Sequence, residues 1–158
     1  MAERTVREKL EANPGHLRMV FKHFPMNRDC NEYVKGRAHT AACAAAVTAE
    51  AARRLGGDDA FWKMHDELFA RQATFGRKPR DFVREACERI EIDEGELWST
   101  IQTTSAWSRV HVHAAQAHAI GVNSTPALYL DGRRLNSWAL NKFWDYLFAM
   151  DRRSGKVA

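Results

Sequence analysis

The residues of this chain whose chemistry would matter most are its cysteines, because a thiol can act as a nucleophile, a metal ligand or half of a disulfide. There are three, Cys30, Cys43 and Cys87, which permit at most one intrachain disulfide. No pair has the Cys-x-x-Cys spacing. Cys87 falls on the apolar side of a predicted helix and is expected to be a small core residue. The sequence contains no recognisable nucleophile–His–Asp arrangement and no phosphate-binding glycine loop.

Histidines in the last third of the chain are the second set of candidate ligands. His111 and His118 share one face of a predicted helix but lie two turns apart, while His113 points elsewhere. No cysteine or carboxylate stands nearby at ligand spacing, and a zinc site needs three or four converging ligands. We therefore predict no metal site and expect surface or packing histidines.

The elements that must position these residues are predicted to be mostly helical, because apolar residues recur at helical spacing between Pro and Gly punctuation. The predicted helices cover residues 2–12, 40–55, 60–71, 79–88, 94–103, 106–120 and 137–150. Thr40, Asp93 and Ser105 are the predicted N-caps of three of them. Residues 17–24 are predicted to form a strand, and residues 27–38 a polar loop that carries Cys30.

A second strand signal lies in residues 121–135. There Thr125-Pro126 is followed by an apolar run over 127–130, which Asp131-Gly132 closes. Proline suits the residue that precedes or opens a strand. Asp-Gly between two short apolar pieces is a strong hairpin signal. This stretch is therefore predicted to be a helix end, a turn and a two-stranded hairpin.

Composition and charge argue against several classes of protein. The chain has 158 residues, enough for one domain with a sizeable core. Its net charge is +4, and its basic residues are interleaved with acids, which is typical of a solvated surface rather than a nucleic-acid interface. The longest apolar run, residues 41–47, is far too short to span a membrane. The chain as written begins without the apolar segment of a signal peptide.

Several blocks of the chain resemble DsbA-like thioredoxin-fold oxidoreductases, and they follow that family's order. The blocks are residues 17–31, 39–46, 61–70, 121–126 and 131–133. The resemblance implies an α/β protein with a thioredoxin-like fold, formed as one domain by residues 1–158, with a large helical insertion over residues 40–120 or so. It also implies thiol–disulfide exchange on unfolded or extended protein substrates, with no cofactor beyond the cysteines.

The resemblance also implies roles for particular residues. In this family a cis Thr-Pro bond faces the active-site cysteines, so Ser124, Thr125 and Pro126 are expected to form the substrate-binding loop. Cys30 and Cys43 both sit at family-matching positions, which leaves two alternatives: a structural disulfide, or two free thiols, one in a loop and one in a packed helix. The family suggests a periplasmic or exported location.

One part of the family pattern is missing. Members begin with a core strand followed by Cys-x-x-Cys at the start of the first helix, whereas residues 2–12 match later turns of that helix. The chain is thus expected to be N-terminally shortened, without the first core strand, and inactive as written, because exchange needs an attacking and a resolving thiol. Unpaired strands would favour homodimers. The alternative is a non-catalytic thioredoxin-fold domain that binds peptides or a partner.

Overall fold

The computed structural model of the chain describes residues 2–136 and 143–144. The chain divides into two compact units. The helical unit is Lys22–Asn123, and the terminal unit combines Met1–Phe21 with Ser124–Ala158. That residues 1–158 form one domain remains a prediction.

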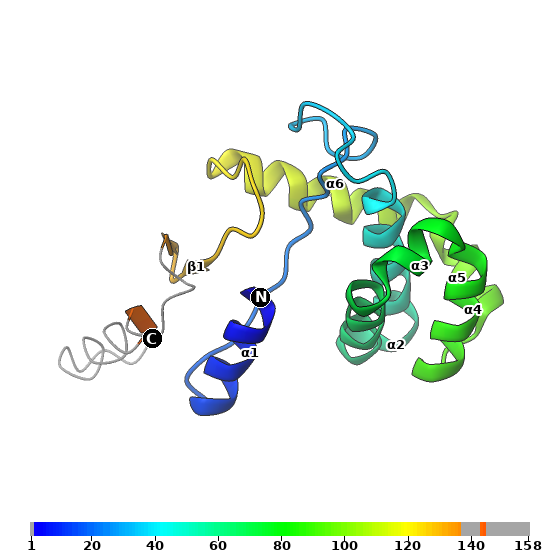
Figure 1. The fold of residues 1–158 in the computed structure, drawn as a ribbon, viewed down its shortest axis with the longest axis horizontal. Helices are drawn as coiled ribbons and strands as arrows, with labels where there is room; N and C mark the ends of the chain where they lie inside the picture. The colour runs from blue at the N-terminus through cyan, green and yellow to red at the C-terminus, as the bar shows by residue number, and fades with distance from the viewer. Residues whose placement is uncertain (1, 137–142, 145–158) are drawn as a thin grey trace. The chain divides into compact units, whose positions relative to one another are not determined.

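The helical unit is built around one long helix (Figure 1). Its helices are α2 (Ala42–Ala70), α3 (Gln72–Arg77), α4 (Pro79–Ile90), α5 (Glu94–Ile101) and α6 (Thr104–Ala119). Helix α2 packs against each of the other four. Val47 and Met64 of α2, Phe82 of α4, Leu97 of α5 and Val110 of α6 are fully buried. Removal of these apolar side chains from water is the main favourable term that holds the helices together.

Several helix ends follow their sequence signals. Pro79 opens α4, and the Asp93 carboxylate accepts a hydrogen bond from the Glu96 N–H at 2.7 Å as the N-cap of α5. After α6 the chain turns at Gly121, whose φ of +78° lies in the left-handed region that favours glycine. The predicted starts of α4 and α5 and the predicted end of α6 are therefore confirmed.

The predicted break at Gly56-Gly57 is present as a kink inside α2. The helix resumes directly after it, so the two predicted helices are continuous in the structure. Gly57 has a φ of 67° and a ψ of −159°, which is not helical. Two predicted caps are wrong: α2 starts after Ala41 and α6 starts after Thr103. Thr40 belongs to the preceding loop, since its carbonyl accepts a hydrogen bond from Asn27. Helix α3 lies between two of the predicted helices, in a stretch for which no helix is predicted from the sequence.

The described part of the terminal unit holds a helix and a hairpin (Figure 1). Helix α1 is Ala2–Ala12, as predicted, and β1 (Tyr129–Leu130) pairs antiparallel with β2 (Arg133–Arg134). Asp131 and Gly132 both have positive φ, 46° and 77°, as a two-residue hairpin turn requires. The predicted hairpin is confirmed, with strands shorter than expected. The predicted helix over 137–150 lies outside the described residues except for Phe143 and Trp144.

Residues 17–24 do not form the predicted strand. Their exposure nevertheless alternates, with Leu17 and Met19 half-buried and Arg18 and Val20 exposed. The two-residue periodicity of the sequence is thus present in the structure. A strand also needs a second strand beside it, and the one sheet of the described residues is formed by β1 and β2 alone. The hydrophobic pattern predicted the alternation of exposed and half-buried side chains but not whether a second strand would lie beside them.

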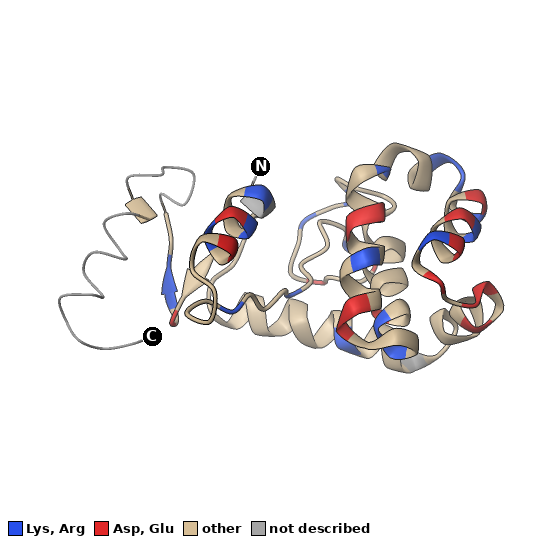
Figure 2. Ribbon diagram, turned by 90° about the horizontal axis from the view of Figure 1, so that it is seen from below, with Lys and Arg blue, Asp and Glu red and all other residues tan. Residues whose placement is uncertain are grey.

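Charges of both signs are interleaved along the helices, as Figure 2 shows for α1 and α4. This matches the solvated surface that the composition predicts. Of the helices that the structure describes, none combines the length and the apolar character that a membrane crossing requires.

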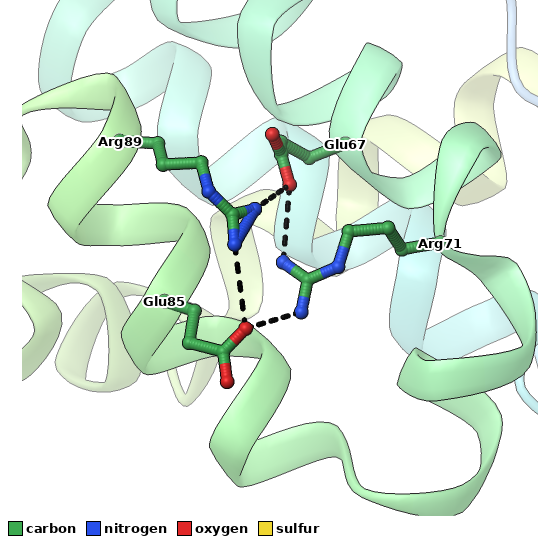
Figure 3. A network of polar contacts seen from close by, with 4 residues as sticks. All are labelled: Glu67, Arg71, Glu85 and Arg89. Carbon is green, nitrogen blue, oxygen red and sulfur yellow. Dashed lines mark hydrogen bonds and ion pairs between the residues drawn. The ribbon is translucent and has the colours of Figure 1, made fainter.

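Four charged side chains join the end of α2 to α4 in a closed ring of ion pairs (Figure 3). One oxygen of Glu67 accepts from Arg71 at 3.2 Å and from Arg89 at 2.7 Å. One oxygen of Glu85 accepts from the same two arginines. The Arg71 guanidinium also lies 5.0 Å from the centre of the Phe82 ring. Burial alone would raise the pKa of Glu67, but its hydrogen bonds to Arg89 and Arg71 outweigh burial and lower that pKa.

We expect Glu67→Gln to destabilise the protein by about 1 kcal/mol, because two arginines lose a shared carboxylate in a partly buried network. The measurement is urea unfolding at pH 7 in low salt. Glu32→Gln is the control, since Glu32 is exposed and lies outside this ring. The difference in unfolding free energy between the two variants should become smaller in 1 M salt, because salt screens partly exposed charges. Equal stability of the two variants would show that the ring contributes nothing.

Candidate functional site

Cys30 and Cys43 form a disulfide, with their Cα atoms 5.8 Å apart. Of the two alternatives left open by the sequence, the disulfide is the one that the structure contains. Both cysteines are buried and pack with Val47 of α2 and Val110 of α6. The bond thus fastens the loop before α2 to the core of the helical unit.

The loop that carries Cys30 is held by a buried asparagine. The Asn27 side chain donates to the Thr40 carbonyl at 3.0 Å and accepts from the Asp29 N–H at 2.9 Å. Its own carbonyl accepts from the Asn31 N–H at 3.1 Å. The Asn31 side chain then donates to the Pro25 carbonyl at 3.0 Å. Side-chain hydrogen bonds therefore fix this loop without regular secondary structure.

Cys87 is the one cysteine outside the disulfide. It is buried on α4, and burial, together with the charges of Glu94 and Asp93, raises the pKa of its thiol to about 11. Thiol exchange requires a thiolate. None of the three cysteine sulfurs is therefore available as a nucleophile at neutral pH.

A buried polar cluster in the helical unit was not predicted from the sequence. It joins His23, Glu50 of α2 and His113 of α6, all of them buried. His23 Nε2 lies 3.1 Å from Glu50 Oε1, and the His23 backbone N–H donates to His113 Nδ1 at 3.3 Å. The other Glu50 oxygen pairs with Arg53 at 2.7 Å and Arg109 at 3.2 Å. The sequence signal was Glu50 itself, a lone acid in an alanine-rich segment.

The cluster perturbs the ionisation of two of its members. Burial would raise the pKa of Glu50, but hydrogen bonds and charges from His23 and Arg53 outweigh it and lower the pKa to about 2. For His113 the largest effect is burial. Together with the nearby charges of His23, Lys22 and Arg109, burial lowers the pKa of His113 to about 4. At neutral pH the cluster therefore holds an ionised carboxylate beside a neutral imidazole.

These residues place three potential metal-ligand atoms within 4.8 Å of one another. Their existing bonds, however, oppose a cation. His23 Nε2 carries a proton toward the ionised Glu50, and the lone pair of His113 Nδ1 already accepts a hydrogen bond. Arg53 and Arg109 place two positive charges on the same carboxylate. A divalent ion would have to displace these partners, so the cluster does not fit a metal and is better described as a structural ion network.

The other two histidines of the sequence prediction lie apart from this cluster. His111 is exposed on α6. His118 is exposed too, and its ring stacks on Tyr33 with centroids 4.1 Å apart. The structure thus brings His113 together with His23 and Glu50 rather than with His111 or His118.

The predicted substrate-binding loop belongs to the terminal unit. Ser124, Thr125 and Pro126 are exposed, and the Thr125–Pro126 peptide bond is cis, the conformation that the resemblance implies. The hairpin that follows is closed by a hydrogen bond from the Leu135 N–H to the Leu128 carbonyl at 2.8 Å. The loop therefore leads directly into a short, hydrogen-bonded element.

We expect one reactive thiol in the denatured, non-reduced protein and almost none in the native protein at pH 8. With a pKa of about 11, only about one Cys87 thiol in a thousand is ionised at that pH, and it is buried besides. Ellman's reagent measures both states, and Cys87→Ser should abolish the denatured signal. Three reactive thiols in non-reduced protein from an oxidising compartment would contradict the disulfide.

We also expect stability to fall as the pH drops from 6.5 to 4. In that window the unfolded imidazole takes up a proton that folded His113 refuses, because its pKa is lowered from 6.5 to about 4. The free energy of unfolding should therefore fall by up to about 3 kcal/mol between pH 6.5 and pH 4. Glu50, whose folded pKa is also lowered, extends the loss below pH 4.5.

His113→Gln should flatten the decline between pH 6.5 and 4, measured by denaturant unfolding at a series of pH values. The glutamine oxygen can still accept the His23 N–H, and it does not titrate. His111→Gln, a change at an exposed histidine of the same helix, is the control and should keep the wild-type slope. Parallel curves for all three proteins would disprove the assignment to His113.

Comparison with known proteins gives a family and several partial relatives. The sequence model of the family described as Thioredoxin matches residues 2–146. The chain is also similar to the Na(+)/H(+) antiporter NhaA 1 of Salinispora arenicola and the Na(+)/H(+) antiporter NhaA 3 of Salinispora tropica. Each is 32% identical over 133 residues, which cover 84% of this chain and 18% of the relative.

A third relative, the Na(+)/H(+) antiporter NhaA 1 of Mycolicibacterium gilvum, is 31% identical over 120 residues, which cover 75% of this chain and 17% of that protein. The chain thus spans less than a fifth of the length of the curated relatives it matches. No solved structure matches it. Because the family match extends over residues 2–146 of the 158, the chain belongs to the thioredoxin family and has a thioredoxin-like fold.

Proposed function

We propose that this chain is a DsbA-like member of the thioredoxin family that takes part in thiol–disulfide exchange on protein substrates. Family membership supports the thioredoxin-like part of the proposal. The helices α2–α6 support the DsbA-like part, since they occupy the place between residues 17–24 and the hairpin where that family carries its helical insertion. The buried Cys30–Cys43 disulfide supports an oxidising, extracytoplasmic compartment.

The observation that carries the proposal is the exposure of Ser124, Thr125 and Pro126 immediately before β1. Exchange on a protein substrate requires that an extended segment be held beside the reacting sulfur. An exposed loop that runs into a strand offers backbone groups with which such a segment can pair. We therefore assign substrate binding to this loop.

The attacking and resolving thiols are not among residues 1–158. Cys30 and Cys43 are joined and buried, and the thiol of Cys87 is buried with a raised pKa. Residues 1–158 by themselves should thus bind substrate without oxidising it. The redox pair must come from sequence other than these residues.

The same three sulfurs favour a second candidate function. A thioredoxin-fold domain without an available thiol can serve as a non-catalytic module that binds extended peptides or a partner. The two candidates share the binding loop and differ in whether a Cys-x-x-Cys pair works with it. The curated relatives are named as sodium–proton antiporters, but the match covers 18% of the first of them, so we do not carry ion exchange over to this chain.

Binding by the loop can be tested with a fluorescently labelled, reduced and unfolded protein, followed by anisotropy. We expect Ser124→Arg to weaken binding about tenfold, because a bulky charged side chain then occupies the loop. Ser99→Arg is the matched control: Ser99 is exposed on α5, in the helical unit. Equal binding by the two variants would remove the loop from the proposal.

A second experiment separates the two candidate functions. The chain is assayed for oxidation of reduced, unfolded substrate, alone and preceded by a grafted core strand with Cys-x-x-Cys from a DsbA-like protein. If the chain is an exchange enzyme, only the grafted protein should be active, and the Ser124→Arg substitution in the graft should abolish that activity. An inactive graft that still binds substrate would favour the non-catalytic binding module.

A further inference from the structure

The helical unit contains a hollow whose lining is strongly basic. Its volume is about 440 Å³, which is in the range of small-molecule sites. Lys22, Arg54 and Arg109 supply three cationic groups, and Ser105, Ser108 and Gln116 supply neutral polar ones. Among the described residues, no carboxylate belongs to the lining. A concave surface with several donors and no acid is suited to an anion.

Two of the three cations are held in place by other side chains. Lys22 Nζ donates to Gln116 Oε1 at 2.8 Å, which ties the segment before the loop to α6. Arg109 Nε lies 3.2 Å from the buried carboxylate of Glu50. Arg54 is exposed on α2, and the salt bridges found among the described residues include none to it. The hollow thus combines two positioned cations with one that faces solvent.

The one carboxylate behind the hollow does not balance these charges. Glu50 already shares its negative charge between Arg53, Arg109 and the His23 ring. Arg53 and Arg109 thus already compensate its charge, whereas Lys22 and Arg54 line the hollow and have no ion pair to it among the described residues. His113, which also lines the hollow, has its pKa lowered first by burial and then by neighbouring positive groups. The surroundings of the hollow are electropositive, which favours an anion.

The hydroxyls narrow the class of anion. Ser105 and Ser108 lie on the same face of α6 as Arg109, so these serines are on the side of the helix that lines the hollow. Arginine, lysine and serine side chains are groups that recognise phosphate oxygens. The hollow is also many times larger than the space of about 30 Å³ that one water occupies. It can therefore accept more than one phosphate group or a phosphate with an attached small molecule.

We propose that this hollow is a binding site for a phosphate-bearing small molecule, held by Lys22, Arg54 and Arg109 with the serine hydroxyls of α6. The site is independent of the function proposed above, because it lies wholly within the helical unit and uses neither the 124–126 loop nor a cysteine. Its ligand would occupy the helical unit while the other unit binds substrate.

The test titrates the full chain with pyrophosphate in a phosphate-free, low-salt buffer, by calorimetry and by amide NMR. Wild-type protein should bind with a Kd of about 1 mM or tighter, with the largest amide shifts at Ser105 and Ser108. Acetate at the same concentration should bind at least about fivefold more weakly, since it carries one charge and two oxygens.

Arg54→Gln should weaken pyrophosphate binding about fivefold to tenfold through loss of one charge-assisted contact. It leaves the ion pairs of Glu50 intact, so folding should be unaffected. Arg84→Gln, a change at an exposed arginine of α4 outside the hollow, is the matched control and should bind as wild type. An absence of binding, amide shifts away from α6, or an equal loss in both variants would overturn the proposal.

Discussion

A single buried carboxylate, that of Glu50, connects three parts of the helical unit that are distant in the sequence. It lies on α2 and is paired with His23 from the segment before the helix, with Arg53 one turn along, and with Arg109 from α6. Burial of a charge costs several kcal/mol unless partners of opposite charge and hydrogen bonds compensate for it. The positions of His23 and Arg109 are therefore constrained by Glu50 as well as by apolar packing. The network is stable only in the arrangement in which all three partners contact the Glu50 carboxylate.

The same network explains the chemistry that surrounds it. Because Glu50 is ionised and already shared, it does not attract a metal ion, although the imidazoles of His23 and His113 lie close by. Because it is one acid among several cations, the surface beside it remains basic. His113 stays neutral in this environment, as its lowered pKa indicates. A buried network of this kind thus both specifies a fold and leaves an electropositive hollow at its edge.

The cysteines illustrate a separate division of roles. The Cys30–Cys43 disulfide and the hydrogen bonds of Asn27 fix the loop before α2, and Cys87 fills space on α4. The sulfurs of all three cysteines are consequently structural. The 124–126 loop, to which we assign substrate binding as a proposal, is exposed and belongs to the other unit. Membership in the thioredoxin family and the lack of an available thiol are thus compatible, provided that binding and redox chemistry are carried by different segments.

Local signals in the sequence determined the elements of this protein well. Several features depend on residues close together in the chain, such as a proline, a capping aspartate or a glycine with positive φ. They are helix α1, the starts of α4 and α5, the break at Gly56-Gly57 and the Asp131-Gly132 hairpin. Three features could not be predicted in this way: the cluster of His23, Glu50 and His113, the ring of ion pairs between α2 and α4, and the basic hollow. Their members come from different elements, and no periodicity records which helix faces will meet. Residues 17–24 are an intermediate case. The alternating exposure of their side chains follows from the local sequence, but whether they become a strand depends on a partner strand. Only the tertiary structure decides such questions, because pairing and charge compensation depend on distances in space rather than on spacing along the chain.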